Sequence, residues 1–236
     1  MGYRELKAGL LGRLGGMWPR EAVATEPPLR AELFGADQMA LHGKVLADSH
    51  FLAHGRVLPD GLLARLDDNE TTLFDACKLL TSAVADNRRI VPAGEWLLDN
   101  FYLIEEQIRM ARRLLPEGYS RELPRLDGGT ATAGRPRVYD IALEAVAHGD
   151  GRVDAENLAR FVAAYQAISP LELGELWAIP IMLRLAVIEN LRRVGVGVAA
   201  GWIERGLADT WADLMTDAVE TDPESLILVV ADMVRS

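Results

Sequence analysis

The sequence contains few residues of the types that bind transition metals or act as nucleophiles. It has four histidines and one cysteine, and His42, His50 and His54 are spaced eight and four residues apart. Two histidines four residues apart on a helix, as His50 and His54 would be, can hold zinc. The sequence has no H-E-x-x-H motif and indicates no third ligand. We therefore interpret these histidines as structural or exposed and predict no metal site.

Two acidic segments resemble metal-binding motifs only superficially. The stretch 148–154 places Asp150 and Asp154 around a glycine turn, as in a calcium loop, but it lacks the bidentate glutamate at the required offset. A helix end followed by an N-cap at Asp154 explains this stretch better. The pair Asp67 and Asp68 lies in a strongly periodic run, which favours a solvated helix face over a metal–nucleotide motif.

A polar helix face is the first candidate binding surface. The helix expected over 96–113 carries Tyr102, Glu106 and Arg109, with Asp99 and Arg113 at the two ends of the same face. The order of acid first and base last suits the helix dipole, and a pair such as Glu106 with Arg109 contributes about 0.2–0.5 kcal/mol. The pattern fits either a solvated structural face or a contact surface for a partner or a sugar.

A polar connection between helices is the second candidate. Tyr119, Arg121, Glu122 and Arg125 crowd the segment 119–126. Polar groups concentrated in an ordered loop point to binding more often than to packing. The structural alternative is that the two arginines cap helix carbonyls or pair with nearby carboxylates.

Two charged residues lie inside the apolar run 179–191, namely Arg184 and Glu189. Because an unpaired buried charge is strongly unfavourable, we expect them to form buried ion pairs with other helices. Removing one partner of such a pair costs about 3–5 kcal/mol.

Acidic residues gather in the last 36 residues of the chain, which carry six of the ten net negative charges. Asp209, Asp213 and Asp217 are each four residues apart, so like charges stack on one helical face and destabilise the helix by a few tenths of a kcal/mol per pair. We interpret this stripe as a surface for a basic partner, with a merely solvated face as the alternative.

The elements that position these residues are predicted to be helices throughout, because apolar residues recur at helical spacing and no stretch alternates convincingly. We predict an all-α multi-helix bundle in which Pro180 kinks or splits one helix near Trp177. Glycines and prolines make 1–33 a flexible leader, and 34–236 a helical domain, with two packed subdomains divided near 119–137 as a further prediction. The expected helices cover about 36–55, 60–87, 93–115, 138–148, 154–168, 169–194, 202–220 and 223–234.

Composition excludes several functional classes. The 236-residue chain has a net charge of −10, which disfavours attraction to nucleic acid. Its single cysteine, Cys77, fits a reducing compartment. No apolar run reaches the roughly 20 residues that span a bilayer, and no signal peptide is evident.

Four separated strings carry a family resemblance: WLLDNFYLIEEQI at 96–108, GYSRELPRL at 118–126, RVYDIA at 137–142 and GELWAIP at 174–180. Together, and in this order, they resemble the N-terminal region of cyclic β-1,2-glucan synthases. The resemblance runs from about Leu33 to Ser236.

The resemblance implies a piece of a very large bacterial inner-membrane enzyme that polymerises glucose from UDP-glucose through a protein-bound intermediate and then cyclises the product. The transferase module of such enzymes carries separated aspartates and a Q-x-x-R-W motif, which this sequence lacks. No catalytic residue is therefore assigned to this chain. UDP-glucose and a divalent metal are expected for the absent transferase module, and no cofactor is expected here.

Two hypotheses follow from the sequence. In the first, the chain is a non-catalytic helical scaffold on the cytoplasmic side of the bacterial inner membrane, without a transmembrane helix of its own. Its partners would be the membrane-embedded glucosyltransferase module and the growing glucan, with no nucleic acid. In the alternative, it is a self-standing helical module that binds a protein or an oligosaccharide.

Overall fold

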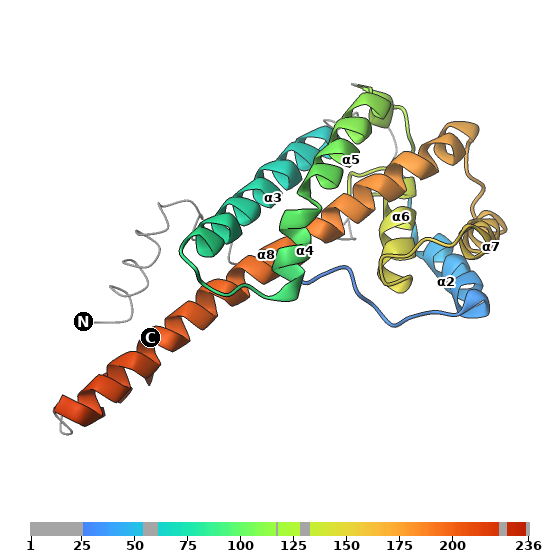
Figure 1. Ribbon diagram of the computed structural model, residues 1–236. Helices are drawn as coiled ribbons and strands as arrows, with labels where there is room; N and C mark the ends of the chain where they lie inside the picture. The colour runs from blue at the N-terminus through green and yellow to red at the C-terminus, as the bar shows by residue number, and fades with distance from the viewer. Residues whose placement is uncertain (1–25, 54–60, 117, 128–132, 222–225, 235–236) are drawn as a thin grey trace. The chain divides into compact units, whose positions relative to one another are not determined.

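The protein is all-α, as the sequence predicts. A computed structural model describes residues 26–53, 61–116, 118–127, 133–221 and 226–234. In these ranges the chain forms eight α-helices and one short 3-10 helix, with two isolated β-bridges and no strand (Figure 1). The elements are α2 (Ala36–Ser49), α3 (Gly61–Ala85), α4 (Pro92–Asp99), α5 (Phe101–Leu114), η2 (Tyr119–Arg121), α6 (Arg137–His148), α7 (Ala155–Gln166), α8 (Leu173–Thr221) and α9 (Leu226–Val234).

Local capping explains where several helices begin. The Asp154 carboxylate accepts a hydrogen bond from the Asn157 N–H at 3.0 Å, so the predicted N-cap of α7 is confirmed. Pro92 occupies the first turn of α4, where its missing N–H leaves no bond unmade. The Gln38 side chain accepts from the Gly35 N–H at 2.9 Å at the start of α2.

The continuous helix expected over 93–115 is wrong, because α4 and α5 are separated at Asn100. The Asn100 side-chain amide donates to the Trp96 carbonyl oxygen at 2.8 Å, a local bond that competes with helical hydrogen bonding. Asp99 therefore belongs to α4, whereas Tyr102, Glu106 and Arg109 belong to α5.

Helix α8 begins at Leu173, not at Ser169 as the Ser-Pro sequence predicts. The Ser169 N–H still bonds the Tyr165 carbonyl at the end of α7. The Glu175 carboxylate accepts from the Glu172 N–H at 2.9 Å and so caps the true start. The helix continues through Pro180 and is not split there.

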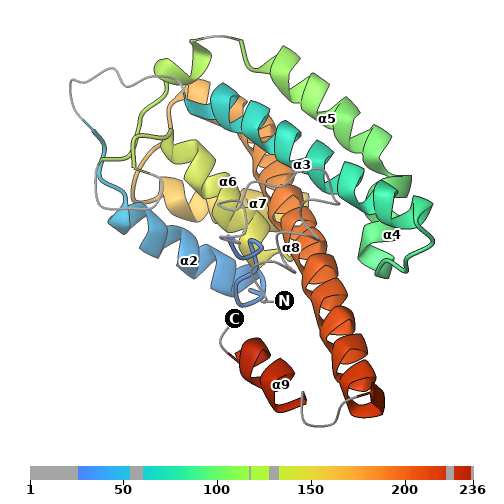
Figure 2. The ribbon, with the colours of Figure 1, turned by 90° about the vertical axis from the view of Figure 1, so that its left-hand side faces the viewer.

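The chain divides into two compact units. The second unit comprises 26–72 and 101–194, which includes the described part of 119–137. Its core joins α2, α6 and α7 through Met39, Leu46, Ile141, Phe161 and Tyr165, which are all buried. Figures 1 and 2 both show α2 beside α7 and α6, and the packing of α2 on α7 brings together residues far apart in the sequence.

The first unit includes the described residues 73–100, 195–221 and 226–234. Within it, Gly195 allows α8 to approach α3 and α4, since an added Cβ would lie 3.3 Å from Leu73 and 3.6 Å from Leu97. The Arg88 guanidinium lies over the Trp202 ring, 4.6 Å from its centroid.

The expected leader is only partly described, and its residues 1–25 lie outside the described ranges. Residues 26–33 are irregular, as predicted, but they are held by hydrogen bonds. The Leu29 N–H donates to the Asn190 side chain at 2.8 Å, and the Ala31 N–H donates to the Ala147 carbonyl at 3.1 Å. Backbone groups of this segment thus find partners on α6 and α8, and the flexibility expected for the leader stays a prediction.

Among the described helices, none is both long enough and apolar enough to cross a membrane.

Candidate functional site

The first predicted surface lies on α5. Tyr102, Glu106 and Arg109 are all exposed, while Ile104 and Ile108 on the opposite side of the helix are buried. The Arg109 guanidinium donates to the Glu105 carbonyl at 3.3 Å within its own helix. The three side chains thus share one exposed helical face, and their role in contacting a partner or a sugar stays a prediction.

In the second predicted surface, the connection 119–126, Tyr119 and Arg125 make contacts within the protein. The Tyr119 hydroxyl donates to the Gly174 carbonyl at 3.0 Å. The Arg125 guanidinium is buried and donates to the carbonyl oxygens of Gly134 at 2.8 Å and Ser120 at 3.2 Å. Arg125 thus bonds backbone carbonyl groups, as the structural alternative expects for it. Arg121 and Glu122 are exposed.

A hollow adjoins this connection. It has a volume of about 300 Å³, and its lining includes Ser120, Arg125 and Arg135. Within the described ranges, the buried Ser120 hydroxyl oxygen has no hydrogen-bond partner. The hollow therefore combines cationic groups with a polar oxygen, which are groups that hydrogen-bond sugar hydroxyls.

The acidic stripe lies on α8 in the first unit. Asp209, Asp213 and Asp217 are all exposed. Their spacing of four residues places them along one side of this helix. The three residues thus lie on an exposed side of α8, and contact with a basic partner stays a prediction.

The expected ion pair of Glu189 is present as a larger cluster. Glu189 is 1% exposed and accepts two bonds from Arg65, at 2.8 and 2.7 Å. Asn69, Arg192 and Arg193 donate to the same carboxylate at 2.9 to 3.0 Å. Burial alone would raise the pKa of the Glu189 carboxyl, but hydrogen bonds and charge from Arg65, followed by bonds from Arg193 and Arg192, hold it well below its usual range.

Arg184, the other charged residue of this apolar run, bonds a neutral group. Its guanidinium donates to the Gln107 amide oxygen on α5 at 3.0 Å. The buried ion pair expected for Arg184 is therefore wrong, because among the described residues its side chain bonds a neutral amide on another helix.

A second buried ion pair joins α6 to the start of α8. The Arg137 guanidinium makes a bidentate pair with Glu175, and both bonds measure 2.7 Å. It also donates to the Ser169 hydroxyl and the Pro170 carbonyl, each at 2.8 Å. Arg137 therefore fixes the connection between α7 and α8, a role that no local signal in the sequence indicated.

His50 makes internal contacts, as the structural interpretation expects. Its buried ring bonds the Tyr165 hydroxyl at 2.8 Å and the Asp140 carboxylate at 3.0 Å. The proposed pairing with His54 lies outside the described residues, and His50 itself lies just after the last residue of α2.

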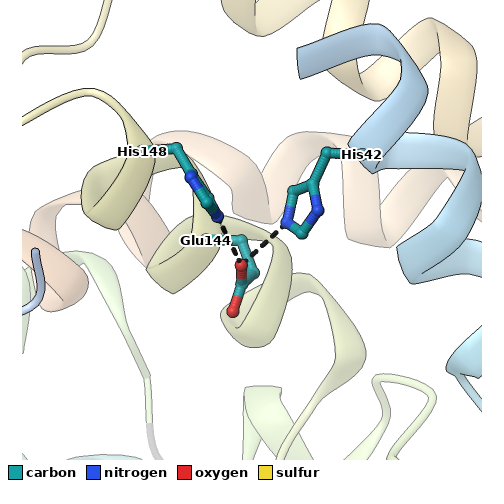
Figure 3. A group of neighbouring side chains, drawn as sticks. All are labelled: His42, Glu144 and His148. Carbon is teal, nitrogen blue, oxygen red and sulfur yellow. Dashed lines mark hydrogen bonds and ion pairs between the residues drawn. The ribbon is translucent and has the colours of Figure 1, made fainter. Parts of the chain in front are cut away.

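The structure brings His42, Glu144 and His148 together, which sequence reasoning did not. Figure 3 shows both imidazole rings turned toward the same Glu144 oxygen. The two Nε2 atoms lie 2.8 Å (His42) and 3.3 Å (His148) from that oxygen, and one ligand atom from each residue lies within 4.8 Å of the others. This histidine–glutamate triad is the group of side chains, among those described, that could hold a metal ion.

Part of the triad could have been found from the sequence. Glu144 and His148 are four residues apart on a helix that the sequence predicts, so they share a face. His42 comes from a helix 102 residues earlier than Glu144, and only the packing of α2 on the other helices brings it there. The third ligand, His42, could therefore be identified only from the tertiary structure.

Comparison with known proteins gives one informative similarity. The chain is 34% identical over 211 residues to a cyclic beta-(1,2)-glucan synthase, NdvB, from Rhizobium meliloti (strain 1021). The match covers 87% of this chain but only 7% of that protein's length. No family model matches the chain. The resemblance to a cyclic β-1,2-glucan synthase is thus confirmed over most of the chain.

Proposed function

We propose that this chain is a non-catalytic helical scaffold region of a cyclic β-1,2-glucan synthase, on the cytoplasmic side of the bacterial inner membrane. The observation that carries the proposal is the similarity over 87% of the chain to a small part of such a synthase. The function of the region would be to support the glucosyltransferase module, which would itself use UDP-glucose and a divalent metal.

The contacts of the buried charged groups support a scaffold role. The Glu189 carboxylate bonds the Arg65 guanidinium of α3 and the Glu175 carboxylate bonds the Arg137 guanidinium of α6, so both carboxylates act as structural partners. A general acid or base must instead be free to exchange a proton with a substrate. The buried charges of the second unit are therefore suited to holding helices together.

The acidic stripe supports a partner for the first unit. Three like charges spaced four residues apart weaken an isolated helix by a few tenths of a kcal/mol per pair, and a basic partner surface would reverse that effect. Helix α9 of the same unit also carries exposed apolar side chains, since Ile227 is 75% and Leu228 68% exposed. The partner proposed is the transferase module of the same synthase.

Deletion tests the scaffold proposal. Removing residues equivalent to 34–236 from a full synthase should abolish assembly and glucan synthesis, and intact synthesis would contradict the proposal. The isolated chain, supplied with labelled UDP-glucose and magnesium, should transfer no label into glucan. Transfer of label would show that the region is itself catalytic.

Charge reversal tests the partner surface. Replacing Asp209, Asp213 and Asp217 with lysine in the full synthase should lower the yield of assembled enzyme. The control reverses three exposed acids away from the stripe, at Asp48, Asp86 and Glu105, and changes the net charge equally. Equal assembly of the two triple variants would exclude the stripe as the interface.

The hollow beside Arg125 favours a second candidate, an oligosaccharide-binding module. Its cationic lining and the buried Ser120 hydroxyl suit sugar hydroxyl groups. Titration of the isolated chain with linear and cyclic β-1,2-glucan by calorimetry tests this candidate. Saturable binding that Arg135→Ala weakens would support it, and the absence of heat beyond dilution would exclude it.

A further inference from the structure

The histidine–glutamate triad of the second unit has the composition and geometry of a metal site. Its three side chains converge from two helices, α2 and α6, on one carboxylate oxygen (Figure 3). We propose that His42, Glu144 and His148 bind a zinc ion through two imidazole nitrogens and one carboxylate oxygen. This proposal does not depend on the relationship to glucan synthases.

The hydrogen bonding of His148 provides the first argument. Its Nδ1 lies 2.6 Å from the Glu32 carbonyl oxygen. A carbonyl oxygen only accepts, so Nδ1 must carry the proton. In a neutral imidazole, Nε2 then holds a lone pair, and that lone pair faces the Glu144 oxygen at 3.3 Å. Two electron-rich atoms that face each other at this distance are stabilised by a cation between them, either a proton or a metal ion.

The surroundings of the ring provide the second argument. Metal-binding histidines characteristically donate their other N–H to a backbone carbonyl or a carboxylate, which fixes the tautomer and the ring orientation. The Glu32 carbonyl fills this role for His148, and the Phe34 ring stacks on the imidazole at 3.9 Å between centroids and 10° between planes. His148 therefore presents Nε2 to the triad in a fixed orientation.

The two distances to the Glu144 oxygen fit zinc after a small adjustment. Zinc bonds of about 2.0–2.2 Å in tetrahedral directions separate neighbouring ligand atoms by about 3.3 Å. The separation between His148 and Glu144 already has this value, whereas the 2.8 Å separation between His42 and Glu144 must widen by about half an ångström. The His42 and Glu144 side chains are 22% and 32% exposed, so they have room to move and an ion can reach them.

The ligand types select among metal ions. Calcium and magnesium prefer oxygen ligands, whereas imidazole suits zinc and other late transition metals. Three protein ligands also leave the fourth tetrahedral position to water or to another ligand. A cavity of about 270 Å³, whose lining includes His148, Arg152 and Asp154, adjoins the triad. The site is thus a partly open zinc site in which one ligand comes from α2 and two come from α6.

Zinc binding by the untagged chain 1–236 tests the proposal. The protein is stripped with a chelator, and zinc affinity and stoichiometry are then measured by calorimetry and by elemental analysis after gel filtration. We expect one zinc per chain and a higher melting temperature with zinc than without it. Cobalt substituted for zinc should give the visible absorption of a tetrahedral site, and calcium should not compete.

Two ligand variants and one control make the test specific. Glu144→Gln and His42→Gln should each weaken zinc binding by at least about 10- to 100-fold. This is the loss that follows when a residue that only hydrogen-bonds a metal ligand is removed, and loss of a ligand itself should cost at least as much. His54→Gln, which changes a histidine outside the triad, should bind like the unaltered chain. Because the His42 side chain is partly exposed, His42→Gln should fold even if Glu144→Gln does not.

Two results would overturn the proposal. If the stripped chain binds no stoichiometric zinc, a proton on His148 balances the Glu144 charge and the triad is an ion pair. If zinc binds equally to the unaltered chain and to both ligand variants, the ion is held elsewhere.

Discussion

Replacing Glu189 with glutamine removes the charge at the centre of the buried cluster while keeping the size of the side chain. Loss of one partner of a buried ion pair costs about 3–5 kcal/mol, because the other charge is left without compensation. Arg65, Arg192 and Arg193 also pair with Glu26, and their side chains are 22%, 11% and 20% exposed, so their charges stay partly compensated without Glu189. We therefore expect the lower end of the range, about 3 kcal/mol, for Glu189→Gln.

Calorimetry and urea denaturation measure this loss. For a chain of this size, each kcal/mol shifts the melting temperature by about 2–4 °C, so a decrease of roughly 6–12 °C is expected. Glu105→Gln is the matched control, because Glu105 is exposed on α5, and it should change stability by no more than about 0.5 kcal/mol. A loss below about 1 kcal/mol for Glu189→Gln would refute the assignment of the cluster as a major source of stability.

The pH dependence of stability, compared between the unaltered chain and Glu189→Gln, provides a second test. Because the folded protein depresses the pKa of Glu189, the carboxylate stabilises the fold above its unfolded pKa, near the ordinary value of 4.5. This stabilisation is lost progressively as the pH falls below that value. The difference in stability between the unaltered chain and Glu189→Gln should thus be largest near neutral pH and should shrink below about pH 4.5. A pH-independent difference would contradict the linkage.

Further predictions concern two buried side chains and two glycines. Burial, followed by the charge of Glu189, raises the pKa of Tyr139 to about 12, so stability should fall by about 3 kcal/mol as the pH rises from 10 to 12, and Tyr139→Phe should reduce that fall in alkaline urea titrations. Arg137→Lys should destabilise the protein by about 1.5–3 kcal/mol in urea denaturation, because an ammonium group cannot reproduce the bidentate pair, and an unchanged midpoint would contradict this. Gly43→Ala would place a Cβ 2.7 Å from the Phe161 carbonyl oxygen and should cost about 1–3 kcal/mol. Gly197→Ala meets no atom within 4 Å and should stabilise the protein by about 0.4–1 kcal/mol; equal melting temperatures for the two alanine variants would contradict both expectations.

The helical fold could be predicted because its signals are local. Apolar spacing, Pro92 at a first turn and Asp154 as an N-cap each act within a few residues of the feature they specify. The prediction of one continuous helix over 93–115 failed at Asn100. Asn100 interrupts a periodic apolar pattern that continues on both sides of it, because its amide bonds the Trp96 carbonyl.

The contacts of the candidate sites were less predictable, because their partners lie far apart in the chain. Burial of Glu189 could be inferred from the apolar run around it, but Arg65 is 124 residues away, and nothing in the sequence distinguishes it from the other arginines.

The histidine–glutamate triad could be predicted only in part from the sequence. Glu144 and His148 share a face at the end of a predicted helix, which supplies two ligands from local spacing alone. The third ligand, His42, lies 102 residues from Glu144 and could be identified only once α2 was known to lie beside α6. Absence of a local third ligand therefore does not exclude a metal site in a helical bundle. A glutamate and a histidine four residues apart on a buried helix are sufficient reason to examine the histidines of every helix that packs against it.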